Sequence, residues 1–302
     1  MNSIPSVQNE LRQLERLSAQ RELYSYAKRL YGVELIGNIV VPVLLACTAL
    51  FVHTLDAIAA AYAISFLSVD TLSIAPIINR TKRKAATIQE LFDCDVLQIP
   101  ISPLKVAKDV TVEEVLTNYD AHSKIASNVE KVKDWYPVNI GQININVARL
   151  ICQRTNCWWD SKLRTRYCSF IKGFSIAIPI IIIGVGVVKD LKFESIILIA
   201  SALVPFFQFC AKEYSDNIDA RERLDKLHAY ITNLWDKIID KTIEESLLVN
   251  HSRSIQDELY ENRSKSPLIL DSIYKKFRKK DETLMDKTAE ILIKEIQDAS
   301  VV

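Results

Sequence analysis

The sequence predicts a mainly α-helical integral membrane protein, with four transmembrane helices in two hairpins plus a largely helical cytosolic body. Four stretches are almost free of charge, although 25% of the 302 residues are charged. These stretches come in two closely spaced pairs, and the segments around them are rich in Lys, Arg, Asp and Glu. Each charge left in hydrocarbon costs a few kcal/mol or more, so this segregation is typical of a chain that lies partly in lipid.

The expected spans are residues 35–55, 57–78, 170–188 and 195–211. The first two are about as long as a bilayer core requires, roughly 20 residues at 1.5 Å each, and the last two are shorter. Only Asp56 separates the first pair and residues 189–194 separate the second, so each pair forms a tight hairpin. A soluble helix would need a polar stripe of period 3.6, and residues 176–188 have none.

Basic residues flank the outer ends of both hairpins, whereas the tips carry few. Arg21, Lys28 and Arg29 precede the first span; Arg80, Lys82, Arg83 and Lys84 follow the second; Lys162, Arg164 and Arg166 precede the third; Lys212 follows the fourth. Cytoplasmic loops carry an excess of Lys and Arg. We therefore expect a multi-pass protein with both termini and the central segment in the cytoplasm.

The expected domains follow this topology. They are a cytosolic amphipathic N-terminal helix (1–34), a first transmembrane hairpin (35–78), a cytosolic insert (79–169), a second hairpin (170–211) and a cytosolic helical C-terminal segment (212–302).

Local patterns in the insert predict several elements. We expect a helix over 82–92 and a short strand over 93–103, ended by prolines. Thr111 and Glu114 form a capping-box pattern, which predicts a helix that starts there and runs toward Lys133. A further helix is expected over 145–152.

The C-terminal segment carries a heptad-like seam over two heptads. Its apolar residues are Leu224, Leu227, Ile231, Leu234 and Ile238. The seam suits packing against the insert of the same chain or an intermolecular coil. Ser266 and Pro267 then predict a break, followed by a last helix over about 270–297.

Composition and motifs exclude several functions. The net charge is +1, which argues against DNA or RNA polymers as partners. There is no phosphate-binding glycine-rich loop and no hydrolase or metalloprotease motif, so we expect no enzyme and no cofactor. The six cysteines do not cluster with the four histidines, so no metal site is expected.

An unusual basic and aromatic stretch covers residues 149–167. Arg154, Trp158, Trp159 and Arg164 are the candidate ligand-binding residues, because aromatic rings stack on bases and guanidinium groups bind phosphate oxygens. The stretch also precedes the third span, where Trp and basic residues suit a membrane interface. Both interpretations stay open.

Polar residues within the first two spans form a second candidate set: Asp70, Ser73 and Asn38. An acid inside a span suggests a functional group that faces a pore or an oligomer contact. Alternatively, Asp70 pairs with Asn38 or a serine inside the helix bundle.

Four sequence elements resemble the SMODS-associated four-transmembrane effector family. They are AQRELYSYAK (19–28), AATIQELFDCDVL (85–97), DWYP (134–137) and ICQRTNCWWDSKLR (151–164). The resemblance implies bacterial antiphage defence from the inner membrane, beside a cyclic-oligonucleotide synthase. It also implies that the effector binds the cyclic oligonucleotide, assembles as a homo-oligomer in the lipid bilayer and permeabilises it, which causes abortive infection.

Three alternatives compete with this function. The first is a nucleotide-independent ion channel, and the second is a membrane scaffold whose cytosolic helices recruit a partner. The third is a lipid-acting enzyme that uses Cys152, Cys157 or Asp160, which lacks a paired base in the sequence.

Overall fold

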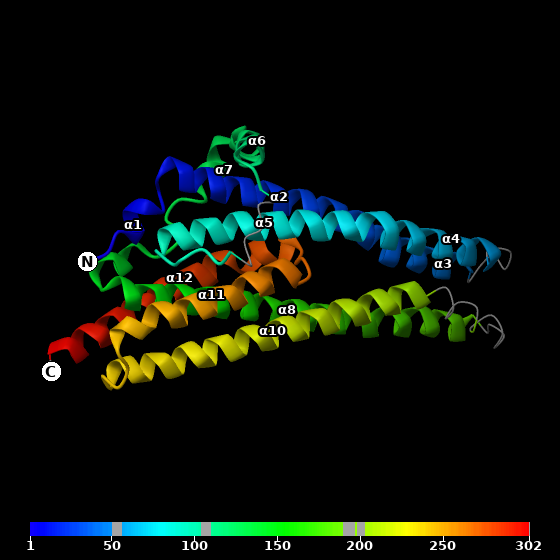
Figure 1. Ribbon diagram of the computed structural model, residues 1–302. Coiled ribbons are helices and arrows are strands. Elements are labelled where there is room, and N and C mark those ends of the chain that lie inside the picture. The colour runs from blue at the N-terminus through cyan, green and yellow to red at the C-terminus, as the bar shows by residue number, and fades with distance from the viewer. Residues whose placement is uncertain (50–55, 104–109, 190–196, 198–202, 302) are drawn as a thin grey trace.

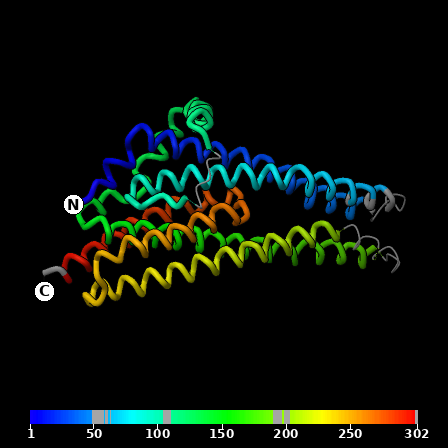
Figure 2. Tube along the Cα trace, in the orientation of Figure 1, coloured from blue at the N-terminus to red at the C-terminus, as the bar shows by residue number. Residues whose placement is uncertain are grey.

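The computed structural model describes residues 1–49, 56–103, 110–189, 197 and 203–301, and most of them are helical. The molecule is elongated (Figures 1 and 2). A thick helical body at one end holds both chain termini, and two helical hairpins extend side by side from it toward the other end. Both termini therefore lie at the end of the molecule away from the hairpins.

Four long helical rods connect the body with the hairpins. They are α2 (Leu11–Leu35) with the π-helical turn η1 (Ile36–Val40) and α3 (Val41–Ala49); α4 (Asp56–Val69) with the π-helical turn η3 (Asp70–Ile74) and α5 (Ala75–Val96); α8 (Ile145–Val188); and α10 (Val204–Ile239). The 44 residues of α8 extend over about 66 Å, more than twice the roughly 30 Å of a bilayer core. The expected borders between spans and cytosolic segments thus fall inside continuous helices.

Shorter elements complete the body. They are α1 (Ile4–Val7), α6 (Val112–Ser123), α7 (Ala126–Glu130), the 3-10 helices η4 (Val138–Gln142) and η5 (Glu245–Leu247), α11 (Leu248–Lys265) and α12 (Asp271–Val301). The break at Ser266 and Pro267 and the last helix are confirmed.

The capping box at α6 is confirmed, but the helix is shorter than predicted. The Thr111 hydroxyl accepts from the Glu114 amide at 3.2 Å, and the Glu114 carboxylate accepts from the Thr111 amide. The helix ends at Ser123 instead of running toward Lys133, and Ile125 is extended. The Asn128 side chain donates to the His122 carbonyl, which satisfies an acceptor at the helix end.

The strand predicted over residues 93–103 is wrong. Helix α5 continues through Val96, and the described residues beyond it contain no strand. Gln98 adopts a left-handed φ of 52°, and the Ile99 amide bonds to the Cys94 carbonyl at 2.9 Å. This Schellman motif ends the helix, and the prolines that follow remove the donors that a strand would need.

Two further predictions on helices are settled. The helix expected over 145–152 exists, but it continues as α8 to Val188. The heptad-like seam packs within the chain: it shares a core with Leu150 of α8 and with Leu248 and Ile255 of α11.

The largest hydrophobic core lies in the body and joins most of its helices. Its buried members include Ile4, Leu17, Phe92, Tyr136, Ile151, Trp235 and Leu292.

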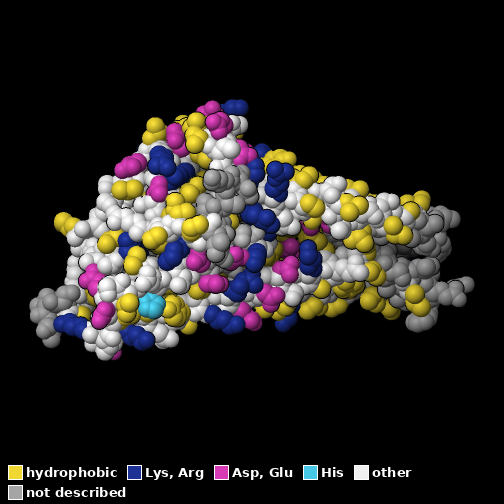
Figure 3. Space-filling view, viewed as in Figure 1, with side chains coloured by type: hydrophobic (Ala, Val, Ile, Leu, Met, Phe, Trp, Pro, Cys, Tyr) yellow, Lys and Arg dark blue, Asp and Glu magenta, His cyan; other side chains and the backbone are white. Residues whose placement is uncertain are grey.

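The hairpin half of the described chain has an uncharged, apolar surface (Figure 3). Ile64, Leu72, Ile180 and Val188 are each at least 64% exposed. Two stretches of the described residues, Leu11–Thr48 and Ile145–Val188, are long and apolar enough to cross a membrane. An apolar surface of this extent requires lipid or protein contacts. The remainder of the first span, most of the second tip and most of residues 195–202 lie outside the described residues.

Candidate functional site

The four predicted ligand residues all lie on α8, but they point to different neighbours. Arg154 lies near Glu295 of α12 and His228 of α10, since each pair interacts electrostatically. The Trp159 ring packs against that of Tyr274 at a centroid distance of 6.2 Å. Arg154, Trp158 and Trp159 are half-buried, and as ligand contacts they stay a prediction.

Arg164, in contrast, is buried and engaged within the fold. Its guanidinium donates to the Asn217 side chain at 2.7 Å, to the Asp160 carboxylate at 3.2 Å and to the Pro267 carbonyl at 3.3 Å. These partners belong to α10, to α8 itself and to the turn between α11 and α12. Arg164 therefore joins three parts of the chain and offers little to a ligand.

The cysteines near the third span are poorly suited to nucleophilic chemistry. Cys152 and Cys157 are fully buried in the helix packing. Burial raises the pKa of both thiols, to about 12 for Cys157. The thiolate is the reactive form, so this burial argues against either cysteine as the nucleophile of a lipid-acting enzyme.

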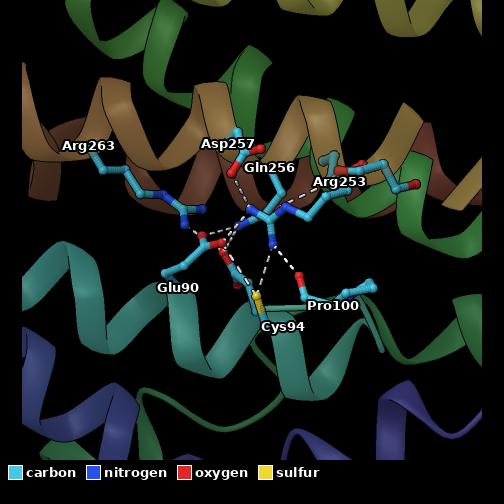
Figure 4. Close-up of polar contacts among 10 residues, drawn as sticks. Glu90, Cys94, Pro100, Arg253, Gln256, Asp257 and Arg263 are labelled. Atoms are coloured by element: carbon cyan, nitrogen blue, oxygen red, sulfur yellow. Dashed lines mark hydrogen bonds and ion pairs between the residues drawn. The ribbon is translucent and has the colours of Figure 1, made fainter. Parts of the chain in front are cut away.

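A polar network of buried ion pairs and hydrogen bonds lies between α5 and α11 (Figure 4). We call it the body network; it consists of Glu90 and Asp93 on α5, Tyr136, and Arg253, Gln256 and Arg263 on α11. Arg263 binds Asp93 at 2.5 Å and Arg253 binds Glu90 at 2.7 Å. Both carboxylates are completely inaccessible to solvent.

Neutral side chains satisfy the remaining oxygens of the body network. The Gln256 amide donates to Glu90 at 2.8 Å and to Asp93 at 2.9 Å. The Tyr136 hydroxyl donates to Asp93 at 2.7 Å. Burial alone would lower the pKa of Arg263, but Asp93 raises it well above its usual value. The charges are thus fixed, and the network holds α5 against α11.

A second polar cluster lies where the four rods leave the body, and we call it the neck. Its members are Tyr31 and Glu34 of α2, Lys82 of α5, Tyr167 of α8 and Glu213 of α10. All five residues are at least nine-tenths buried.

Three helices meet at the Tyr31 hydroxyl. It lies 2.7 Å from the Tyr167 hydroxyl and donates to the Glu213 carboxylate at 2.9 Å. A hydroxyl has one proton, so the bond between the two tyrosines takes its proton from Tyr167. Burial, opposed by the Tyr31 bond and assisted by the charge of Glu34, raises the pKa of Glu213 to about 7.

Glu34 has an equally unusual environment. Burial and then Asp70 raise its pKa to about 7, while Lys212 and Lys82 act in the opposite direction. No ion pair among the described residues involves Glu34 or Glu213. Both carboxyls therefore gain or lose a proton near neutral pH.

Lys82 brings a buried amine to the neck. Its ammonium group donates to the Lys265 carbonyl at 3.3 Å, which connects α5 with the end of α11. Burial, and then the charge of Arg164, lowers the pKa of Lys82 to about 8.

The predicted polar residues of the first two spans, Asn38, Asp70 and Ser73, lie on the hairpin side of the neck. The Asn38 amide donates to the Asp70 carboxylate at 3.4 Å and to the Glu34 carbonyl at 3.1 Å. Asn38 and Asp70 belong to the two π-helical turns, which are therefore neighbours. Ser73 is exposed and does not join them.

Sequence reasoning missed the neck because its charges lie at the expected ends of spans. Glu34 immediately precedes the first span, Glu213 follows the fourth by two residues, and Lys82 belongs to a basic flank. Charges at such positions normally reach water or headgroups. Only the packing of the four rods shows that these three side chains are buried.

Together, the fold and the neck define a class: a helical protein whose polar body continues through long rods into uncharged hairpins suited to a membrane. A family model described as the SMODS-associating 4TM effector domain matches residues 2–292, so the chain belongs to this family. The resemblance seen in the sequence is thereby confirmed. No curated protein and no solved structure matches the chain. Membership supports a membrane location and an effector role; the family is not a known enzyme family.

Proposed function

We propose that the protein is a membrane effector of bacterial antiphage defence that binds a cyclic oligonucleotide through its cytosolic body and then permeabilises the inner membrane. Its family membership supports the effector role. The observation that carries the mechanism is the continuity of the four rods, which run without interruption from the body through the neck into the hairpins. A rearrangement in the body thereby reaches the hairpins through rigid helices.

The neck is the element whose arrangement changes. Its tyrosines and acids join α2, α8 and α10 by hydrogen bonds, whereas its acids lack ion pairs within the described chain. The neck thus has two arrangements in equilibrium. A ligand shifts this equilibrium only if it binds one arrangement more tightly than the other. Arg164 couples this region to the turn after α11, because it binds Asn217 and the Pro267 carbonyl.

The membrane lesion requires several copies of the chain. Ser65, Ser68, Thr71 and Ser73 lie in the second expected span and are exposed. The described helices of a single chain leave this polar face uncovered. Packing these faces together in a homo-oligomer with four spans per chain would line a pore with hydroxyl groups beside Asp70.

Dye release from liposomes tests the proposal. Purified protein is reconstituted in vesicles of bacterial lipid that contain a self-quenched dye, and a panel of cyclic di- and trinucleotides of adenine and guanine is added. Release that depends on one nucleotide supports the effector. Release without any nucleotide identifies the constitutive channel, and no release despite nucleotide binding identifies the scaffold.

A conservative variant tests the coupling role of Arg164. Arg164→Lys keeps the charge but cannot reproduce three directed bonds. We expect nucleotide binding to persist and dye release to fall at least tenfold. Lys162→Arg is the matched control, since Lys162 is exposed on the same helix. Equal dye release by the Arg164→Lys variant and the wild-type protein would rule out this coupling role.

A further inference from the structure

A cleft of about 430 Å³ lies between α2, α5 and α6, next to the neck. Ligand pockets typically measure roughly 300–1,000 Å³. The candidate residues Arg154, Trp158 and Trp159 line neither this cleft nor a second cleft of about 600 Å³, whose described lining residues include one cation, Lys241. The cleft beside α6 differs from that second cleft in charge, because three cations line it.

Cations from two rods line this cleft. Arg29 of α2 and Arg80 and Lys84 of α5 all contribute to its wall. Arg29 is held by Glu22 at 3.1 Å and Lys84 by Glu114 of α6. Arg80 is exposed and forms no hydrogen bond or ion pair with any described residue, although its charge lies near enough to Glu114 to lower the pKa of that carboxyl. Its guanidinium is thus free to bind two oxygens of one phosphate.

An aromatic ring and an amide accompany these cations. Tyr26 lines the cleft with 44% of its surface exposed, and the Arg29 guanidinium carbon lies 5.8 Å from its ring centre. Such a ring is a stacking surface for a base. The Asn118 amide donates to the Glu114 carbonyl at 2.7 Å, which leaves its side-chain oxygen as an acceptor for a base amino group.

We propose that the cleft between α2, α5 and α6 binds the nucleotide messenger, with Arg80, Lys84 and Arg29 on its phosphates and Tyr26 stacked on a base. The inference rests on the proposed function and locates its ligand. Glu114 and Glu22 hold two of the cations in place before binding. Arg80 lies two residues before the neck residue Lys82 on the same helix, so a ligand there binds a rod that also carries part of the neck.

The position beside the hairpins also suits a phosphate from another source, the headgroup of an anionic lipid. The shared chemistry is a phosphate that accepts from guanidinium groups. Tyr26 and Asn118 favour the nucleotide, because a glycerol headgroup has no ring to stack.

The test measures the Kd of the full-length protein in neutral detergent for a panel of cyclic di- and trinucleotides of adenine and guanine. We expect Arg80→Ala to raise the Kd about 10- to 100-fold. Tyr26→Ala should raise it about tenfold, while Tyr26→Phe keeps the ring and the affinity. Arg83→Ala is the matched control, because Arg83 is exposed on the same helix but does not line the cleft. Circular dichroism verifies that each variant is folded.

The outcomes separate this inference from the proposed function. If the wild-type protein binds no member of the panel, both are wrong. If it binds one and the Arg80→Ala and Tyr26→Ala variants bind equally well, the cleft is not the site, although the messenger function stands. Added phosphatidylglycerol that displaces the nucleotide from wild-type protein but not from the Arg80→Ala variant would assign the cleft to lipid instead.

Discussion

The body network and the neck both bury two carboxyl groups, yet they treat them in opposite ways. In the body, Glu90 and Asp93 each bind a guanidinium at 2.7 Å or less. In the neck, Glu213 meets a tyrosine hydroxyl, and neither it nor Glu34 forms an ion pair with a described residue. The first arrangement fixes charge, and the second leaves the charge dependent on pH.

This difference indicates which part of the molecule can rearrange. Removing one partner of a buried ion pair leaves an uncompensated charge, so a network in which each buried carboxylate has a guanidinium partner strongly resists rearrangement. A buried carboxyl with a pKa near neutrality can be charged or neutral at little cost. The body is thus the rigid frame, and the neck is the adjustable joint between it and the hairpins.

The largest expected effect tests the rigid half. Asp93→Ala leaves Arg263 buried without its partner and removes the acceptor of Tyr136. We expect the free energy of unfolding to fall by about 3–5 kcal/mol. Urea unfolding of the detergent-solubilised protein, followed by circular dichroism, measures this loss. A loss below about 1 kcal/mol would show that the body network is not the frame.

The next effect tests the adjustable half. The pKa of Glu213 rises from 4.5 to about 7 on folding, so the folded state binds the proton more tightly. The unfolding free energy therefore falls as pH rises from about 4.5 to about 7. Glu213→Gln removes this loss and is expected to stabilise the protein at pH 8 by at most about 3 kcal/mol.

Thermal unfolding between pH 5 and pH 8 follows the Glu213→Gln variant. Glu222→Gln is the control, because Glu222 is exposed on the same helix. If the thermal stability of the Glu213→Gln variant depends on pH in the same way as that of the wild-type protein, Glu213 does not take up a proton in the neck.

A smaller effect is expected from the tyrosine that joins three helices. Tyr31→Phe removes the donor to Glu213 and the acceptor for Tyr167. The predicted loss is about 1–3 kcal/mol and is larger at pH 8, where Glu213 is charged, than at pH 5.5. Thermal unfolding at both pH values measures it, and Tyr214→Phe, at an exposed site on α10, is the control. Equal losses at the two pH values would mean that the stabilisation by Tyr31 does not depend on the charge of Glu213.

The smallest effect sharpens the contrast within the body. Asp257 binds Arg253 at 2.9 Å, but its side chain is 30% exposed. Arg253 keeps its bonds to Glu90 and to the Pro100 carbonyl when Asp257 is lost. Asp257→Ala should therefore cost less than about 1 kcal/mol in urea unfolding. A cost equal to that of Asp93→Ala would mean that burial does not set the strength of these pairs.

The sequence predicted helix starts and breaks correctly where neighbouring residues alone determine them. The capping box of Thr111 and Glu114 and the break at Ser266 and Pro267 depend on neighbouring residues, and both are confirmed. The strand over 93–103 was wrong because α5 continues through Val96, with Asp93 bound to Arg263 of α11, and a Schellman motif at Gln98 then ends the helix.

The candidate site was predicted only in part. Residue types suggested that Arg154, Trp158, Trp159 and Arg164 share one ligand, yet the helix points them toward different neighbours. The link between Asn38 and Asp70 was foreseen as one of two alternatives, since two polar groups in apolar spans have few other partners. Cleft residues such as Tyr26 and Arg80 lie 54 positions apart, and no local pattern connects them.

By itself, the sequence determined the mainly helical fold, the uncharged hairpins and the family, because composition, spacing and motifs are properties of short stretches. Only the tertiary structure decided that Glu34, Lys82 and Glu213 are buried together and that α2, α5 and α6 enclose a basic cleft. The physical reason is that desolvation and charge pairing depend on which helices pack side by side. That choice is made by contacts between residues far apart in the chain.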